Sequence, residues 1–211
     1  MNFTDSAVVL IKRDIRESDR IVSVYTRNRG RMNIRFPGVN KHSSRLKAFT
    51  EPFVWADMRI YIRQGAAVGC GTGGKIQSVF PGIRADARKT QLALHFCELM
   101  FRLTPELQAN EDKFTLLLHA LRFLNNNSPL PSTRAAFTFR LMQTAGFGLS
   151  EPVLGISGEF WDKLHHSAFE TLAFASPLEK EELAKSEYVL TRFFSRTFAQ
   201  GLKTLPSITA P

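Results

Sequence analysis

Apolar and polar residues alternate with a period of two in several short segments of the first 80 residues, which is typical of β-strands with one buried face. Turn residues separate these segments, as at Asn28-Arg29-Gly30 and Pro37-Gly38. The predicted strands cover residues 6–13, 20–27, 31–36, 53–63 and 66–80. Five short strands in so little chain predict a small closed barrel, for which the OB-fold is the obvious five-stranded candidate.

The pattern changes after Pro81-Gly82, where apolar residues begin to recur at the spacing of a helical face. Asn110 is placed to cap one of the helices, and Gly146 to end another. The predicted helices cover residues 83–103, 111–124, 132–145, 160–174 and 178–202. The predicted fold class is therefore α+β, with an OB-fold β-barrel over residues 1–80 followed by an all-helical domain over residues 81–211.

The net charge of +9 is concentrated in the predicted barrel. Residues 1–80 contain 14 Lys and Arg against 6 Asp and Glu, whereas residues 81–211 contain 14 against 13. A generally basic protein would spread its charge evenly. A polyanion that docks on the N-terminal region explains the distribution better.

The densest run of cations lies in residues 27–47, which contain no Asp or Glu. Alternation within this run puts Arg31, Asn33 and Arg35 on one side of a strand, with apolar residues on the other. Residues 38–47 have small and polar residues between their cations and are predicted to form an exposed loop. A cationic strand that leads into a basic loop is suited to a phosphate backbone.

A second alternation, over residues 53–63, puts apolar residues on a core face and interleaves aromatic residues with arginines on the other. Phe53 and Trp55 either stack on bases or pack against another layer of the protein, and the pattern leaves both open. Arg59, Tyr61 and Arg63 of that face are expected to be exposed. The residues predicted to bind the nucleic acid, which is DNA if the family resemblance described below holds, are Arg16, Arg20, Arg29, Arg31, Arg35, Lys41, Arg45, Lys47, Arg59, Tyr61, Arg63 and Lys75.

Residues 69–75 match the GxGxxG pattern and most of the phosphate-loop pattern. Ile76 stands where a phosphate loop needs Ser or Thr, and a strand-like segment follows where both motifs need a helix. We therefore expect a glycine-rich hairpin, or a bulged strand in a tight barrel, rather than a nucleotide site.

The remaining candidates for chemistry are sparse. Cys70 and Cys97 form no CxxC pair, and Cys97 is expected to be a small buried apolar residue. The adjacent His165 and His166 do not share a helical face and are expected to be solvated. We expect no catalytic group, metal or cofactor. Residues 1–13 contain no signal sequence or membrane span, so the protein is expected to be soluble and cytoplasmic, without membrane contact. If its polyanion is DNA, it is also expected to be nucleoid-associated.

The chain resembles the RecO family of bacterial recombinational-repair proteins. The similarity covers most of the chain in the right order, although each matching segment is short. The segments are DIRESDRIV at 14–22, GV at 38–39 with the basic loop to Arg45, EPF at 51–53, SVFPGIR at 78–84, Phe137 with AGFG at 145–148 and, more weakly, LKT at 202–204.

The resemblance implies an N-terminal OB barrel, a helical domain and a non-catalytic function. Proteins of this family bind single- and double-stranded DNA and anneal complementary strands. They partner RecR and contact the C-terminal tail of single-stranded DNA-binding protein (SSB). They thereby help RecA load onto coated strands, so RecA is an indirect partner.

One departure from the family concerns zinc. Many members carry a four-cysteine zinc module after the Gly-Phe-Gly segment, whereas residues 149–157 contain no cysteine here. We therefore predict no zinc, which puts any partner contact made through that module in doubt.

An acidic, aromatic-ended tail would bind where cations lie beside an apolar groove. The candidate residues for such a contact in the helical domain are Arg134, Phe137, Arg140 and Leu141. The alternative is that Phe137 and Leu141 belong to the core. A rival for the whole protein is an RNA-binding OB module on a helical scaffold, for instance in ribosome assembly, because charge alone does not distinguish the two nucleic acids.

Overall fold

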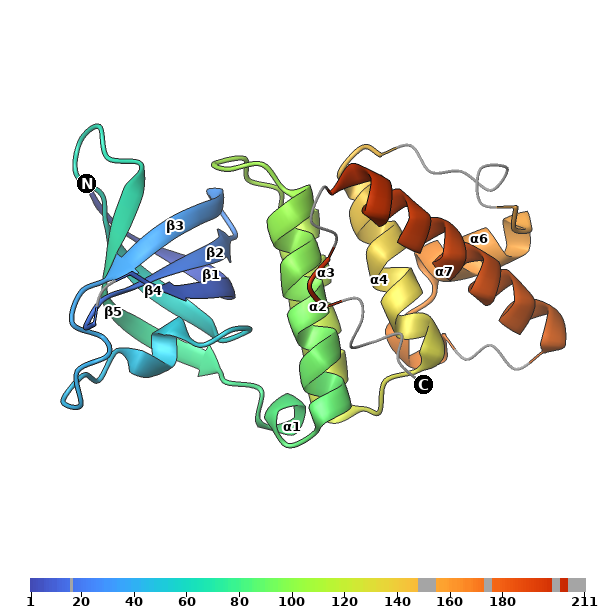
Figure 1. The fold of residues 1–211 in the computed structure, drawn as a ribbon, viewed down its shortest axis with the longest axis horizontal. Helices are drawn as coiled ribbons and strands as arrows, with labels where there is room; N and C mark the ends of the chain where they lie inside the picture. The colour runs from blue at the N-terminus through green and yellow to red at the C-terminus, as the bar shows by residue number, and fades with distance from the viewer. Residues whose placement is uncertain (16, 148–154, 173–175, 199–201, 205–211) are drawn as a thin grey trace.

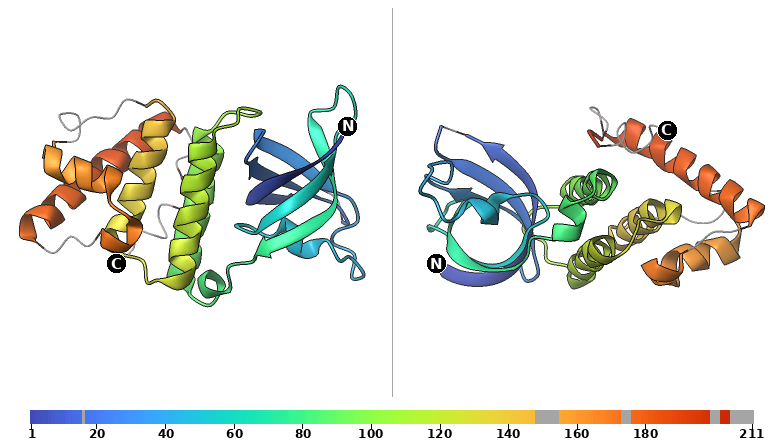
Figure 2. Two further views of the ribbon diagram at one scale, coloured as in Figure 1. Left: turned by 180° about the vertical axis from the view of Figure 1, so that it is seen from behind. Right: turned by 90° about the horizontal axis from the view of Figure 1, so that it is seen from below.

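The computed structural model describes residues 1–15, 17–147, 155–172, 176–198 and 202–204. Its N-terminal part is a closed β-barrel with strand order β1-β2-β3-β5-β4, in which β3 and β5 pair in parallel. The barrel is seen nearly end-on as a ring in Figure 2. This result confirms the predicted five-stranded OB-fold. The strands are β1 (Asn2–Asp14), β2 (Arg20–Thr26), β3 (Gly30–Phe36), β4 (Trp55–Tyr61) and β5 (Val68–Ser78).

The predicted alternation determines which side chains fill the barrel. In β3 every second residue is buried, so Met32, Ile34 and Phe36 point inward while Arg31 and Arg35 point outward. The first strand begins at Asn2 rather than at residue 6, because pairing with β4 extends as far as Asn2 opposite Tyr61.

The glycine-rich segment is part of β5, and its pairing with β4 is interrupted by two register shifts. A Cβ at Gly71 would lie 2.3 Å from the Phe36 ring, and a Cβ at Gly74 would lie 2.0 Å from the Asp57 carbonyl oxygen. These glycines therefore make room for the barrel core and for a close backbone approach. The prediction of a bulged strand in a tight barrel is confirmed.

The helices follow the barrel from residue 81 onward and lie on one side of it (Figure 1). The predicted helix over 83–103 is two helices, because the Asp86 side chain caps the second by accepting hydrogen bonds from the Arg88 and Lys89 amides. Asn110 caps α3 as predicted. The helices are α1 (Pro81–Arg84), α2 (Ala87–Leu103), α3 (Glu111–Asn126), α4 (Pro131–Thr144), α6 (Gly158–His166) and α7 (Pro177–Thr197).

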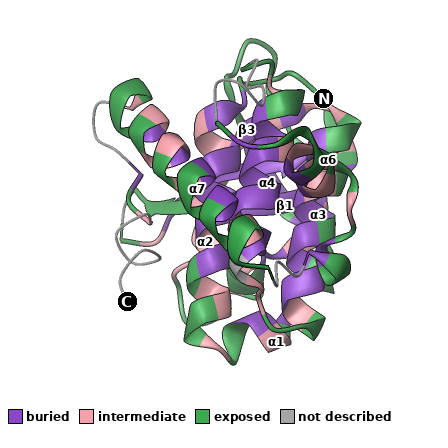
Figure 3. Cartoon of the chain, turned by 90° about the vertical axis from the view of Figure 1, so that its right-hand side faces the viewer, coloured by how far each residue is buried: buried purple, intermediate pink, exposed green. Residues whose placement is uncertain are grey.

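The outer face of the barrel and the helices share one hydrophobic cluster, and a second cluster fills the barrel. Val8, Leu10 and Tyr25 point out of the barrel and join the same buried cluster as Phe96 of α2. Phe53 is buried in this cluster, which favours the packing alternative for it. Helix α4 forms the buried centre of the helical half, whereas α7 exposes one face (Figure 3). The division of the chain at residue 80 stays a prediction.

Two expectations about single residues can be compared with the structure. Cys97 is fully buried, which raises the pKa of its thiol to about 12, as expected for a small apolar residue of the core. His165 is half-buried rather than solvated, because its ring lies 4.0 Å from that of Trp161. None of the helices in the described ranges has the length and apolarity to cross a membrane.

Candidate nucleic-acid interface

One row of outward-facing side chains crosses all five strands of the barrel, and we call it the cross-strand row. Arg13 of β1 is in register with Ile21 of β2, which is in register with Arg35 of β3. Arg35 pairs with Cys70 of β5, which in turn pairs with Tyr61 of β4. Strand pairing thus brings two cations and an exposed aromatic ring from distant segments into one row that runs round the barrel. In OB-folds the face of the second and third strands is the usual site for oligonucleotides.

The loops next to the cross-strand row are held by Asp19. Its carboxylate accepts hydrogen bonds from the Gly38 amide at 2.8 Å and from Arg35 Nη2 at 2.5 Å. These two donors, the amide first, lower the pKa of Asp19 to about 2. Asp19 is therefore ionised at neutral pH and offsets part of the Arg35 charge. It also fixes the start of the loop that carries Lys41, which lies in the turn after Gly38.

A second group of cations lies on the β4–β5 side of the barrel. Arg59 points outward from β4, and its Nη2 lies 3.3 Å from where a Cβ at Gly73 would stand. Leu46 approaches the same point to 3.8 Å, which places the basic segment 45–47 beside Arg59. Lys75 is exposed in register with Asp57.

Several predicted residues are exposed and have no ion-pair partner in the described part of the chain. Arg13, which the prediction omitted, belongs with them, and it becomes recognisable only once the register of β1 and β2 is known. The predicted Arg16 lies outside the described residues. The exposed, unpaired predicted cations are Lys41, Arg45, Lys47, Arg59, Arg63 and Lys75.

Arg20 was predicted to contact DNA, but the structure places it in the interior. Its side chain is 7% exposed and pairs with Asp14 at 2.8 Å and Glu51 at 2.9 Å. It also donates a hydrogen bond to Thr50 Oγ1. This geometry leaves no donor surface for a phosphate, so Arg20 is a structural residue.

Arg31 and Arg29 are also engaged within the fold. The Arg31 guanidinium donates to the Thr104 carbonyl oxygen, pairs with Glu106 and lies over the Phe101 ring. The Arg29 guanidinium lies 4.0 Å from the centroid of the Phe3 ring and is half-buried. Arg31 therefore ties the barrel to the helical half, and reversing its charge would disturb that contact.

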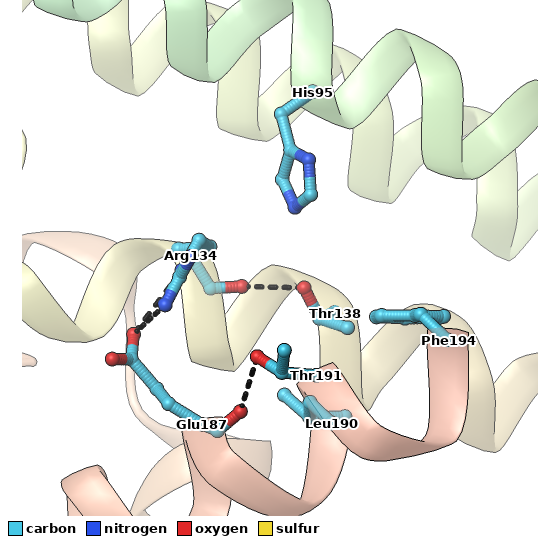
Figure 4. Close-up of a pocket in the computed structure, with 7 residues that line it drawn as sticks. All are labelled: His95, Arg134, Thr138, Glu187, Leu190, Thr191 and Phe194. Atoms are coloured by element: carbon cyan, nitrogen blue, oxygen red, sulfur yellow. Dashed lines mark hydrogen bonds and ion pairs between the residues drawn. The ribbon is translucent and has the colours of Figure 1, made fainter. Parts of the chain in front are cut away.

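The residues predicted to bind a peptide tail do not form a groove. Phe137 and Leu141 are both fully buried, and Phe137 stacks on Phe96 with ring centroids 4.0 Å apart. Arg134 pairs with Glu187 of α7 at 2.7 Å, beside a cavity of about 10 Å³ that His95 also lines (Figure 4). The alternative that the two apolar residues belong to the core agrees with this structure.

Arg140 is likewise turned inward. Its guanidinium donates to the carbonyl oxygens of Leu164 and Ser167, which joins α4 to the end of α6. Burial lowers its pKa, and the Phe169 ring lies 4.9 Å from the guanidinium carbon. Both arginines of this set therefore stabilise helix packing.

The described residues contain no group of three or more His, Cys, Asp or Glu side chains that could hold a metal ion. Residues 149–154 of the segment that lacks cysteines lie outside the described ranges. The prediction about zinc therefore rests on the sequence.

The strand order, the closed barrel and the helices packed on one side define an α+β protein with an N-terminal OB-fold. The model of the family described as "Recombination protein O N terminal" matches residues 1–69, and "Recombination protein O C terminal" matches residues 84–209. The chain belongs to the RecO family.

Curated relatives support this membership. The DNA repair protein RecO of Geobacter metallireducens is 33% identical over 144 residues, which cover 68% of this chain and 58% of the relative. The protein of the same name from Dehalococcoides mccartyi is 29% identical over 146 residues, covering 69% and 57%. That of Pelotomaculum thermopropionicum is 35% identical over 118 residues, covering 56% and 45%. The chain thus matches about half the length of these relatives.

Proposed function

We propose that this chain is a non-catalytic DNA-binding mediator of recombinational repair. It binds single- and double-stranded DNA through the barrel and anneals complementary strands. With RecR it helps RecA load onto single strands coated by SSB. The observation that carries the proposal is the set of exposed, unpaired cations on and beside the cross-strand row, in a family whose members are named DNA repair proteins.

The physical basis of this activity is electrostatic. Arg13, Lys41 and their neighbours would neutralise phosphates and release condensed counterions, which makes binding tolerant of sequence and steeply dependent on salt. Two strands held on one cationic surface repel each other less, so they pair faster. This step needs neither ATP nor an acid–base group.

Tyr61 adds an aromatic surface to the same row. Its side chain is 44% exposed and lies one strand away from Cys70 and two from Arg35. A base stacked on such a ring contributes about 1–3 kcal/mol. The row therefore combines phosphate contacts with a stacking platform.

We retain the C-terminal tail of SSB as a partner, but through a surface other than the one predicted from sequence. Phe137 and Leu141 are buried, and Arg134 and Arg140 are engaged with Glu187 and with backbone carbonyl groups. An acidic tail needs accessible cations, and the surplus of positive charge lies on the barrel.

The test is an annealing assay with two complementary labelled oligonucleotides, bare or coated with SSB, over a salt series. We expect faster pairing that persists on coated strands and weakens as salt rises. Binding without acceleration would contradict the mediator function. A matched RNA competitor that displaces DNA at equal concentration would instead favour the RNA-binding alternative.

Charge-reversal variants locate the interface. Arg13→Glu combined with Lys41→Glu should lower DNA affinity at least about 100-fold and reduce the salt slope by about 2, since two phosphate contacts are lost. The control is Lys180→Glu with Arg196→Glu, which changes the net charge equally on exposed positions of α7. Equal losses in both variants would show that only net charge matters.

A further inference from the structure

A hollow of about 280 Å³ lies where the barrel meets the end of α2. Its floor is a second row of side chains in register across four strands, made by Ile11, Ser23, Asn33 and Val68. The helical half supplies the wall through Phe101 and Glu106. We call this site the barrel–helix hollow; its lining also includes Arg13, Ile21 and Arg31.

The polar groups of the hollow are connected to one another. Ser23 Oγ donates to Asn33 Oδ1 at 2.6 Å, and Asn33 Nδ2 donates to Glu106 Oε1 at 3.2 Å. Arg31 Nη1 donates to the same carboxylate oxygen at 3.1 Å. Within the described ranges the other carboxylate oxygen of Glu106, Oε2, accepts no hydrogen bond from the protein. About half of this side chain is exposed, so the oxygen can be reached from solvent. One strong acceptor is therefore available to a ligand.

The loop that carries Glu106 is fixed against the barrel. The Leu107 amide donates to the Arg31 carbonyl oxygen at 2.9 Å, and Leu107 has a left-handed backbone with φ of 57°. Gly30 approaches Gln108 so closely that a Cβ would lie 2.1 Å from its carbonyl oxygen. A strained backbone held by its surroundings is common at ligand sites, because it keeps a contacting group in place.

We propose that the barrel–helix hollow binds one unstacked nucleobase of a single DNA strand; this inference rests on the proposed function. The volume of about 280 Å³ lies just below the roughly 300–1,000 Å³ that small-molecule sites occupy, so it suits one ring. Phe101 and Val68 supply apolar lining against which that ring would pack, and the free oxygen of Glu106 would meet its edge. Arg13 lines both the hollow and the cross-strand row, where it would hold the adjoining phosphate.

The free carboxylate oxygen of Glu106 can discriminate between bases by the groups on their edges. Cytosine carries an exocyclic amino group, and a carboxylate is a usual partner for it. Thymine presents carbonyl oxygens on both sides of its single N–H, and a carboxylate repels these oxygens. The hollow therefore prefers cytosine to thymine.

The test compares homo-oligomers of dC and dT of equal length by fluorescence anisotropy at neutral pH and fixed salt. We expect dC to bind about fivefold more tightly than dT. Glu106→Gln should bring the ratio of the two dissociation constants close to one. Glu106→Asp, which keeps the charge but withdraws the oxygen, should also lower the ratio.

The matched control is Glu111→Gln, which removes one negative charge from an exposed position outside the hollow, 3.9 Å from Arg27. It should change both affinities by the same factor and keep the ratio. Equal binding of dC and dT by the unmodified protein, or a ratio that survives Glu106→Gln, would overturn the base pocket alone. Failure to bind either oligomer would overturn the DNA-binding proposal itself.

Discussion

Residues 1–80 and 81–211 contain the same number of Lys and Arg side chains, 14 in each region, but the first contains 6 Asp and Glu and the second 13. Both regions form ion pairs, such as Arg35 with Asp19 in the barrel and Arg134 with Glu187 in the helical half. Both also carry exposed cations with no ion-pair partner that the structure describes, such as Lys41 and Arg196. The comparison teaches that the number of carboxylates, rather than the number of cations, gives the barrel its surplus of positive charge.

The largest effect that this comparison predicts is on stability. Phe137→Ala should lower the free energy of unfolding by about 3–5 kcal/mol, since the ring is fully buried against Phe96. The DNA affinity of the folded protein should not change. Chemical denaturation measures the first quantity and anisotropy the second. A cost below about 1 kcal/mol would indicate that the side chain is accessible and would restore the tail-binding hypothesis.

A pair of arginines within the barrel sharpens the comparison. Arg20→Gln should destabilise the fold by about 1–3 kcal/mol, because Asp14 and Glu51 lose their common partner. Arg13→Gln should change stability by no more than about 0.5 kcal/mol but weaken DNA binding. Thermal unfolding and anisotropy on both variants separate the two roles. The reverse pattern would contradict the assignment of Arg20 to the interior.

Two exposed tyrosines provide a matched test of stacking. Tyr61→Ala should weaken binding of single-stranded DNA by about 1–3 kcal/mol with little change in stability. Tyr188→Ala, on α7 and 61% exposed, should leave affinity unchanged. If both variants bind as the unmodified protein does, the cross-strand row does not stack bases.

The smallest predicted effect is a pH dependence of stability that arises in the helical half. Burial, and secondarily the nearby Arg134, lowers the pKa of His95 from 6.5 to about 3, and His95 Nδ1 lies 2.8 Å from Thr204 Oγ1. Between these two pKa values the unfolded chain binds a proton that the folded chain does not, so stability falls as the pH falls. The expected loss from His95 is about 1 kcal/mol between pH 7 and 5.5.

The variants His95→Gln and His166→Gln check this prediction. The first should remove that part of the pH dependence, and the second is the control, a histidine replaced at an exposed position away from Thr204. Urea unfolding at several pH values measures both. An identical slope in His95→Gln and the unmodified protein would show that another group titrates.

Much of the fold could be predicted because its signals are local. The alternation in residues 31–36 determines which side chains of β3 point inward, and Asn110 marks the start of α3. The ends of strands and helices that depend on a partner strand or on a capping residue were not predicted. Residues 2–5 join β1 because they pair with β4, and Asp86 caps α2 after α1 has ended at Arg84.

The sequence by itself determined the class of fold and the region that carries the surplus charge, since both follow from period and composition. Only the tertiary structure decided which cations remain accessible. Arg20 donates to Glu51 across 31 residues, Arg134 to Glu187 across 53 and Arg31 to Glu106 across 75. Local patterns do not encode contacts of such separation, because these form only when the chain packs. The same packing aligns Arg13, Arg35 and Tyr61 in one row across the strands.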